Sequence, residues 1–373
     1  MPLSAITIIP YKIGFFKTQQ GEKRLERHKI SAAFISFFFL FCAAGAFAKT
    51  GPAPQGYYGA GPIPIRNQMP LYLFYLQMEP DKASVTEQNK FDINAGYTVS
   101  NVTVSCFTPA TSLYNINIDA EVSRMTLDLR YGLFEKLEAG LEVPYLSLSA
   151  GYLDRFVEGV EDTVGARTPR SRTRQGAYNY NYSFIYNTQE LIGRKHSSEG
   201  LGDVVLKAKY QVMEEAGYSY MPNISFRSAV KFPTGRKKDL TGSGEFDYGL
   251  GVAADKSFFK RIRVYCGLNA VFIKKPSFFS VLDMKKEIFS GMLGMEYFFT
   301  NRISMVAQVT GNSTPYPSSE TNALDDPGID VGLGVNYKFK EKENVSWHFA
   351  CTENINSAAS PDVSFDTGLN VGF

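Results

Sequence analysis

The sequence predicts an all-β fold: a transmembrane antiparallel β-barrel of about 12 strands, preceded by a periplasmic N-terminal arm. Three observations predict it, namely long segments that alternate apolar and polar residues, connections whose lengths alternate between short and long, and an export leader. The composition agrees, because 29 Phe, 22 Tyr and 32 Gly among 373 residues favour strands and turns. A mean hydropathy of -0.17 excludes a helical membrane bundle.

The leader comes first along the chain. An apolar run over 30–41 follows a basic stretch and ends in small residues up to Ala48, the pattern of a secretory signal cleaved after Ala48. An uncleaved membrane anchor is the less favoured interpretation, because the run is marginal for a span of about 20 residues. The leader holds six of the 39 Lys and Arg and two of the 37 Asp and Glu, so 33 basic and 35 acidic residues remain. The mature chain is therefore slightly acidic, and its charge gives no support to a nucleic-acid partner.

Residues 49–88 form a Pro- and Gly-rich stretch, too interrupted for a helix or a central strand. We expect an N-terminal arm there that could enter the barrel from the periplasm as a plug. The barrel itself is expected over 89–373, with a long extracellular loop at 150–200.

The barrel strands are predicted from strict alternation. In one segment Leu206, Ala208 and Tyr210 share a face, while Lys207 and Lys209 lie on the other. Segments of about ten residues suit a tilted strand that crosses a bilayer. The expected strands are 89–104, 113–132, 136–149, 201–213, 219–233, 245–257, 261–274, 286–299, 301–312, 328–340, 344–354 and 362–373. Short connections follow the even-numbered strands and longer ones mostly follow the odd-numbered strands, as in outer-membrane barrels with short periplasmic turns.

Charged residues of both signs recur on the faces opposite the apolar ones, so they are expected to line the lumen. Mixed signs predict a lumen that is internally paired or hydrated. The candidate lumen-lining residues are Asp128, Arg130, Glu138, Glu142, Asp203, Lys207, Lys209, Arg227, Lys231, Arg263, Glu296 and Asp330.

The last strand alternates up to a terminal Phe373. A final strand of this kind resembles the signal that the barrel-insertion machinery reads, so that machinery and outer-membrane lipid are expected partners. The longest loop carries Arg167, Arg170, Arg172 and Arg174, which could contact lipopolysaccharide phosphates or remain solvated.

Little in the sequence favours catalysis. Outside the leader, His196 and His348 are the available imidazoles, and neither has a nucleophile at a recognisable spacing. We expect no enzyme, catalytic residue, metal or cofactor, and treat a rim hydrolase that uses His196 or His348 as the least favoured hypothesis.

Several segments resemble known families. GPIPIRNQMPLYLFYL, TVSN, LDRFVEGVEDTVGA and GLGDVVLKAKY resemble a bacterial outer-membrane barrel family known only as a domain of unknown function. LRYGLFEKLEAGLEVP, GLGDVVLKAKY, AVKFPTG and GSGEFDYGLGV are similar to outer-membrane proteins given a transport role in phenol meta-degradation. The resemblance spans Pro62 to Phe373 and implies an outer-membrane channel or transporter for a small solute, with hydrophobic solutes among the candidates. A structural or surface-interaction barrel is the alternative, and a plugged interior would favour it.

Overall fold

The computed structural model describes residues 60–107, 113–153, 155, 159, 180–215, 221–258, 261–319, 321–340, 344–355 and 359–373. The predicted signal peptide, residues 1–48, lies outside this part of the chain. The same is true of the loop arginines Arg167, Arg170, Arg172 and Arg174.

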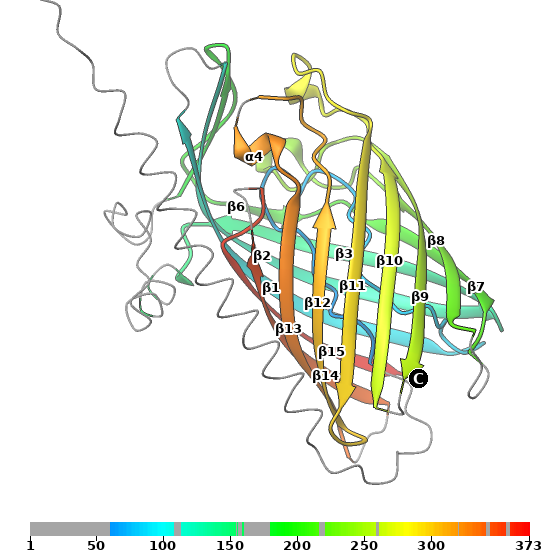
Figure 1. Cartoon of the computed structure of the whole chain (residues 1–373). Coiled ribbons are helices and arrows are strands. Elements are labelled where there is room, and N and C mark those ends of the chain that lie inside the picture. The colour runs from blue at the N-terminus through cyan, green and yellow to red at the C-terminus, as the bar shows by residue number, and fades with distance from the viewer. Residues whose placement is uncertain are drawn as a thin grey trace, which may run out of the picture.

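Twelve long antiparallel strands form the wall of the molecule (Figure 1). Each pairs with its neighbours along the chain, and the pairing of the first with the last closes the barrel. The strands are β1 (Phe91–Phe107), β2 (Tyr114–Phe134), β3 (Leu137–Ser149), β7 (Val205–Met213), β8 (Asn223–Lys231), β9 (Asp247–Phe258), β10 (Ile262–Phe272), β11 (Glu287–Phe298), β12 (Ile303–Asn312), β13 (Gly328–Lys338), β14 (Val345–Asn354) and β15 (Val363–Gly372).

The predicted fold class is confirmed. Closure pairs Asp92 with Gly372 at one end of the seam and Asn101 with Val363 at the other. No strand of the wall is left with an unpaired edge, because every backbone group in hydrocarbon needs a partner. Observed and predicted strand limits differ by a few residues, as where the predicted 261–274 is strand Ile262–Phe272.

The long connection after β3 contains strands that the sequence did not predict. The hairpin of β4 (Asn181–Tyr186) and β5 (Gln189–Arg194) extends the sheet, because β4 pairs with the protruding first part of β2. A short strand, β6 (Ser198–Leu201), pairs with the end of β3. These strands cover edges that β2 and β3 would otherwise expose. Residues 150–200 were predicted as a loop because the segments are too short to show alternation.

Most of the short connections lie at one end of the barrel, here called the short-turn end, and the longest ones lie at the other, the long-loop end (Figure 1). The β7–β8 connection is the longest at the short-turn end, and the β1–β2 connection is the shortest at the long-loop end. The long loops also carry the short helices η1 (Lys237–Asp239), η2 (Ser277–Phe279) and α4 (Asn322–Asp325). Among the described residues, no helix is long and apolar enough to span a membrane.

Alternation sorts the side chains between the two faces of the wall. Leu268 is 66% exposed and Phe226 57% exposed, and both point outward. Ser225 and Asp247, which are fully buried, point inward. An apolar belt around a polar interior is the arrangement that a bilayer requires.

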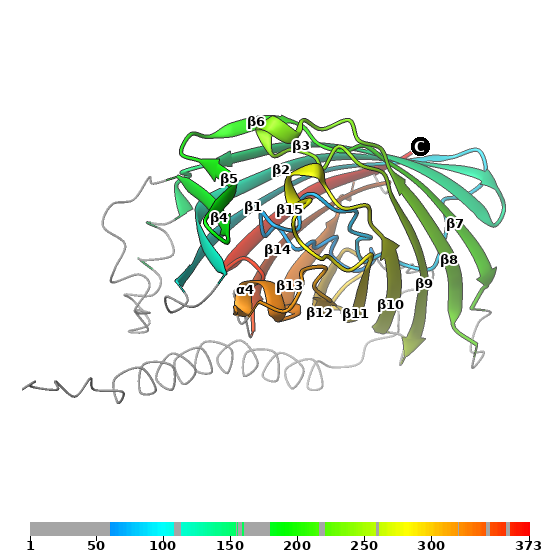
Figure 2. The ribbon, with the colours of Figure 1, turned by 90° about the horizontal axis from the view of Figure 1, so that it is seen from above.

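The interior is occupied by the N-terminal arm. Residues 61–86 run inside the ring of strands, as the blue trace in Figure 2 shows. Residues 61–76 are buried apart from Pro64, which is half-buried. At the start of β1, by contrast, Ile93 is half-buried and Ala95 is exposed.

We predict that the outward face is a depth-dependent lipid contact. Leu268→Arg, in the middle of β10, should lower the free energy of unfolding from phospholipid vesicles by about 2–4 kcal/mol. Phe339→Arg, at the exposed short-turn end just beyond β13, is the matched control and should cost about 1 kcal/mol or less. Urea titrations of the refolded variants measure both values, and equal costs would contradict this placement.

Candidate functional site in the barrel lumen

The arm enters and leaves the lumen at the same end. Its ascending limb, residues 60–68, starts where the Ala60 amide donates to Glu296 near the short-turn end of β11 (3.3 Å). Its apex, residues 69–75, lies at the long-loop end. Its descending limb, residues 76–88, starts where the Leu76 amide donates to Asp247 (2.9 Å) and returns to the short-turn end, where the Thr86 amide donates to Glu138 (2.7 Å). The arm is therefore a re-entrant plug.

The wall is shaped to receive the ascending limb. The Ile63 amide donates to Gln308 (2.8 Å), and the Gln308 amide group donates back to the Ile63 carbonyl (2.9 Å). A Cβ at Gly334 would lie 2.4 Å from Ile63 Cδ1, and one at Gly332 would lie 2.5 Å from Ile65 Cδ1. The glycines of the VGLGVN segment thus leave the space that these two isoleucines occupy.

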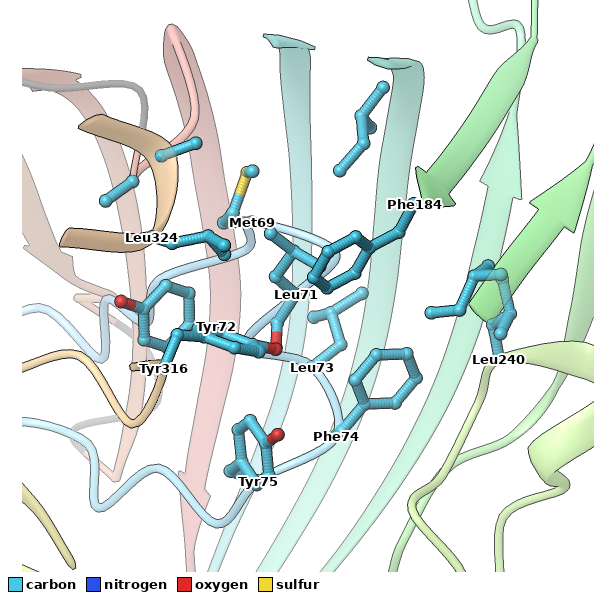
Figure 3. Packing of buried hydrophobic residues seen from close by; sticks show 14 of the residues in the cluster. Met69, Leu71, Tyr72, Leu73, Phe74, Tyr75, Phe184, Leu240, Tyr316 and Leu324 are labelled. Atoms are coloured by element: carbon cyan, nitrogen blue, oxygen red, sulfur yellow. The ribbon is translucent and has the colours of Figure 1, made fainter. Parts of the chain in front are cut away.

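The apex is the apolar part of the plug. Leu71 and Phe74 are fully buried, in a cluster with Tyr316 from a long loop (Figure 3). Phe279, from another long loop, belongs to the same cluster. The rings of Phe279 and Tyr316 meet edge to face, with centroids 5.7 Å apart. Burying a large apolar side chain contributes about 1.5–3 kcal/mol, so these contacts fix the apex beneath the loops.

Hydrogen bonds satisfy the backbone of the apex. The Tyr316 hydroxyl donates to the Leu71 carbonyl (2.7 Å), and the Lys231 ammonium donates to the Phe74 carbonyl (2.7 Å). Burial raises the pKa of Tyr316 well above its ordinary value, so its hydroxyl remains a donor at neutral pH.

The descending limb is held by charge. Glu79 binds Arg66 (2.6 Å) and Lys207 (3.0 Å), while Asp81 binds Arg130 (3.0 Å) and Lys209 (3.0 Å). Wall residues complete a continuous ion network with these arm residues. We call it the arm–wall ion network; it consists of Arg66, Glu79 and Asp81 of the arm and of Arg124, Asp128, Arg130, Glu138, Glu142, Lys207 and Lys209 of the wall.

The network makes the plug interdependent with the wall. Arg66, on the ascending limb, binds Glu142 of β3 (2.5 Å) as well as Glu79, so one guanidinium joins both limbs to the wall. Removing one partner from a buried ion pair typically costs about 3–5 kcal/mol, because it leaves the other charge uncompensated.

The candidate lumen-lining residues are buried or half-buried, and they form separate groups. Asp128, Arg130, Glu138, Glu142, Lys207 and Lys209 meet in the arm–wall ion network. Lys231 binds Asp203 (2.7 Å) and Asp247 (3.1 Å) beneath the apex. At the short-turn end Arg263 binds Asp255, and Glu296 accepts from Tyr265 and Ser304. Asp330 accepts from Ser360 (3.3 Å), and Arg227 is buried on β8.

Sequence reasoning missed Glu79 and Asp81. They follow an apolar stretch in a Pro-containing segment without alternation, so no periodicity marks them as inward-facing. Arg66 was recognised as part of the arm, but its partners lie 13 and 76 residues away. Pairings of this kind depend on the tertiary path of the arm.

The two candidate histidines differ in setting. His348 on β14 lies in the lumen with Nε2 2.8 Å from Asp366 Oδ1, whereas His196 is exposed between β5 and β6. In the described ranges, no Ser, Thr or Cys side chain hydrogen-bonds to either imidazole. The geometry gives neither histidine a nucleophile to activate.

Small cavities remain around the arm. One of about 50 Å³ lies between its two limbs, and one of about 20 Å³ lies beside the arm–wall ion network. A cavity that binds benzene measures about 150 Å³. With the arm in this position, the larger cavity has room for a few waters or a very small solute.

Comparisons with known proteins agree with the barrel. A family model described as "Protein of unknown function (DUF3187)" matches residues 38–373. The crystal structure of the COG4313 outer membrane channel from Pseudomonas putida F1 aligns with a TM-score of 0.51 and 13% identity, covering 80% of this chain and 100% of that one. That likeness shows a shared fold.

Two other structures align with lower scores. The toluene transporter TbuX of Ralstonia pickettii gives a TM-score of 0.40 at 10% identity, covering 87% of this chain and 97% of that one. The KdgM porin gives 0.39 at 8% identity, covering 76% and 99%. No curated protein matches the chain significantly.

We predict that charge fixes the descending limb. In the double variant Glu79→Gln and Asp81→Asn, the basic partners of the limb lose their counter-charges. Amide hydrogen exchange over 76–86 should then accelerate at least about tenfold, the equivalent of losing one charge-assisted hydrogen bond. Asp283→Asn, which changes an exposed loop carboxylate, is the matched control. Unchanged exchange over 76–86 in the double variant would show that the limb does not depend on these charges.

Proposed function

The chain belongs to the DUF3187 family, and we propose that it is an outer-membrane channel for a small solute, closed by its own N-terminal arm. The observation that carries the proposal is the re-entrant plug. A polar lumen is occupied by a segment of the same chain, and ion pairs rather than a continuous apolar core hold most of its descending limb.

The character of the contacts supports a movable closure. Ion pairs and hydrogen bonds can be exchanged for water or for a polar solute, whereas a packed apolar core resists such exchange. The wall behind the descending limb carries Lys207, Lys209 and Glu142, which remain hydrophilic after the limb leaves. Displacement of the arm thus leaves a lumen that accepts water.

The size of the cavities indicates which solutes the arm excludes from the lumen. At about 50 Å³, the space beside the arm admits nothing as large as benzene. Passage of such a solute requires the arm to move. The fold likeness to an outer membrane channel supports a transport role for this barrel.

Location and partners follow from the same proposal. The predicted leader directs export, and the outward apolar belt meets outer-membrane lipid. The alternating last strand, β15, followed by Phe373, would engage the insertion machinery. The long loops would then be extracellular, where Arg167, Arg170, Arg172 and Arg174 could contact lipopolysaccharide phosphates.

A structural barrel is the second candidate, and the filled lumen favours it. If the arm never leaves, the barrel presents loops at the cell surface and passes nothing. Mobility of the arm separates the two functions.

We predict that locking the arm abolishes conductance. Gly332 lies beneath the Ile65 side chain, so Ile65→Cys with Gly332→Cys should form a disulfide between arm and wall. The three cysteines that remain after the leader, Cys106, Cys266 and Cys351, are first replaced by Ser. In planar bilayers the reduced protein should show single-channel openings, the oxidised protein none, and a reductant should restore them.

Deletion of residues 49–86 provides the opposite state and should raise conductance at least several-fold. The single variants Ile65→Cys and Gly332→Cys control for the substitutions themselves. Absence of conductance in the reduced and deleted proteins alike would leave the structural barrel as the function.

A further inference from the structure

The larger cavity is built jointly by the arm and the wall. Ile65, Arg66, Asn67 and Tyr72 of the arm line it, as do residues of β8, β10, β11, β12 and β13. The wall residues that the argument uses are Arg227, Met292 and Asp330.

Arg227 is the most unusual group in this cavity. It is 7% exposed, yet within the described ranges no hydrogen bond or ion pair engages its guanidinium. The residues opposite it on the adjacent strands are Lys209 and Gly251, so neither neighbour supplies a carboxylate. Asp81 interacts electrostatically with Arg227 and is ion-paired directly with Lys209 (3.0 Å). A guanidinium can donate two parallel hydrogen bonds to a carboxylate, and this buried guanidinium has no carboxylate in that position.

Arg66 also lines this cavity. Its Nη2 is engaged by Glu79 and Glu142, whereas its Nε is buried without a hydrogen-bond partner. Two guanidinium groups, one from the arm and one from the wall, therefore line one cavity, and each has N–H groups that form no hydrogen bond among the described residues.

The other residues that line the cavity indicate what kind of ligand would fit beside the two guanidinium groups. Met292 (8% exposed) and Ile288 (5% exposed) form an apolar side. Asp330, on the far wall, is an acceptor held by Ser360 (3.3 Å). Asp330 is an acid itself and provides no cationic complement for a second anionic group, so the cavity suits a ligand with one carboxylate and a short apolar body.

We propose that this cavity binds a solute that carries a single carboxylate, with Arg227 as the anchor and Arg66 Nε–H as the second donor. The inference rests on the proposed channel function and names the class of its solute. Because Arg66 also ties the arm to Glu142, a carboxylate bound here competes for the residue that joins both limbs of the plug to the wall. Solute binding and release of the arm are thereby coupled.

Acetate tests the site, and acetamide is its uncharged equivalent of nearly the same size. Saturation-transfer NMR on refolded protein in detergent micelles, at constant ionic strength, measures both. Acetate should bind and acetamide should bind at least about tenfold more weakly, as expected for the loss of a charge-assisted hydrogen bond. Arg227→Gln should weaken acetate binding at least about tenfold, and Asp330→Asn should strengthen it.

Arg302→Gln, at an exposed arginine near the short-turn end, is the matched control and should leave acetate binding unchanged. Equal binding of acetate and acetamide, or acetate binding that survives Arg227→Gln in a protein that still migrates as a folded barrel, would overturn the proposal. Conductance in bilayers separates this result from the channel function. Openings without acetate binding reject the carboxylate site alone, whereas acetate binding without openings keeps the site and rejects the channel.

Discussion

Closure of the strand ladder is the constraint on which the rest of this structure depends. In hydrocarbon each backbone amide and carbonyl needs a partner, and pairing β1 with β15 provides one along the seam. Closure also divides every strand into an outer and an inner face, so that apolar residues such as Leu268 meet lipid and polar residues such as Asp247 point inward. The polar interior that results must then be satisfied by water or by protein, and here the arm satisfies much of it.

The arm and the wall are matched position by position. Where the ascending limb carries bulky Ile63 and Ile65, β13 has Gly334 and Gly332. Where the descending limb carries Glu79 and Asp81, the wall presents Lys207, Arg130 and Lys209. Steric fit sets the register of one limb and charge sets that of the other. The plug therefore has one position in the lumen without being part of the sheet.

Much of this fold could be predicted from the sequence because its main constraint is periodic. Alternation in segments such as 261–274 reports the two faces directly, and the lengths of the connections report the two ends of the barrel. The lumen residues on the strands were predicted for the same reason.

The features that could not be predicted leave no periodic pattern in the sequence. The path of the arm depends on contacts between distant residues, such as Ala60 with Glu296, and β4 to β6 are too short to alternate recognisably. The pairing of each candidate lumen charge was unpredictable as well, since seven predicted strands together supply candidates of both signs. Among the residues that the structure describes, Arg130 forms direct ion pairs and Arg227 forms none, a difference that depends on the tertiary fold.

The two ends of the plug differ in the kind of energy that holds them, and this difference suggests how it moves. The apex is buried against Phe279 and Tyr316 of the long loops by apolar contact, which is insensitive to charge. The descending limb is held by ion pairs, which Arg66 of the ascending limb joins, and the strength of these pairs depends on the charges in the lumen. In the proposed channel, an anionic solute would act on the limbs first, at Arg66, while the apex would respond to rearrangement of the loops. Full opening of the lumen would require both, so the arm would link the loops at one end of the barrel to the proposed solute site inside it.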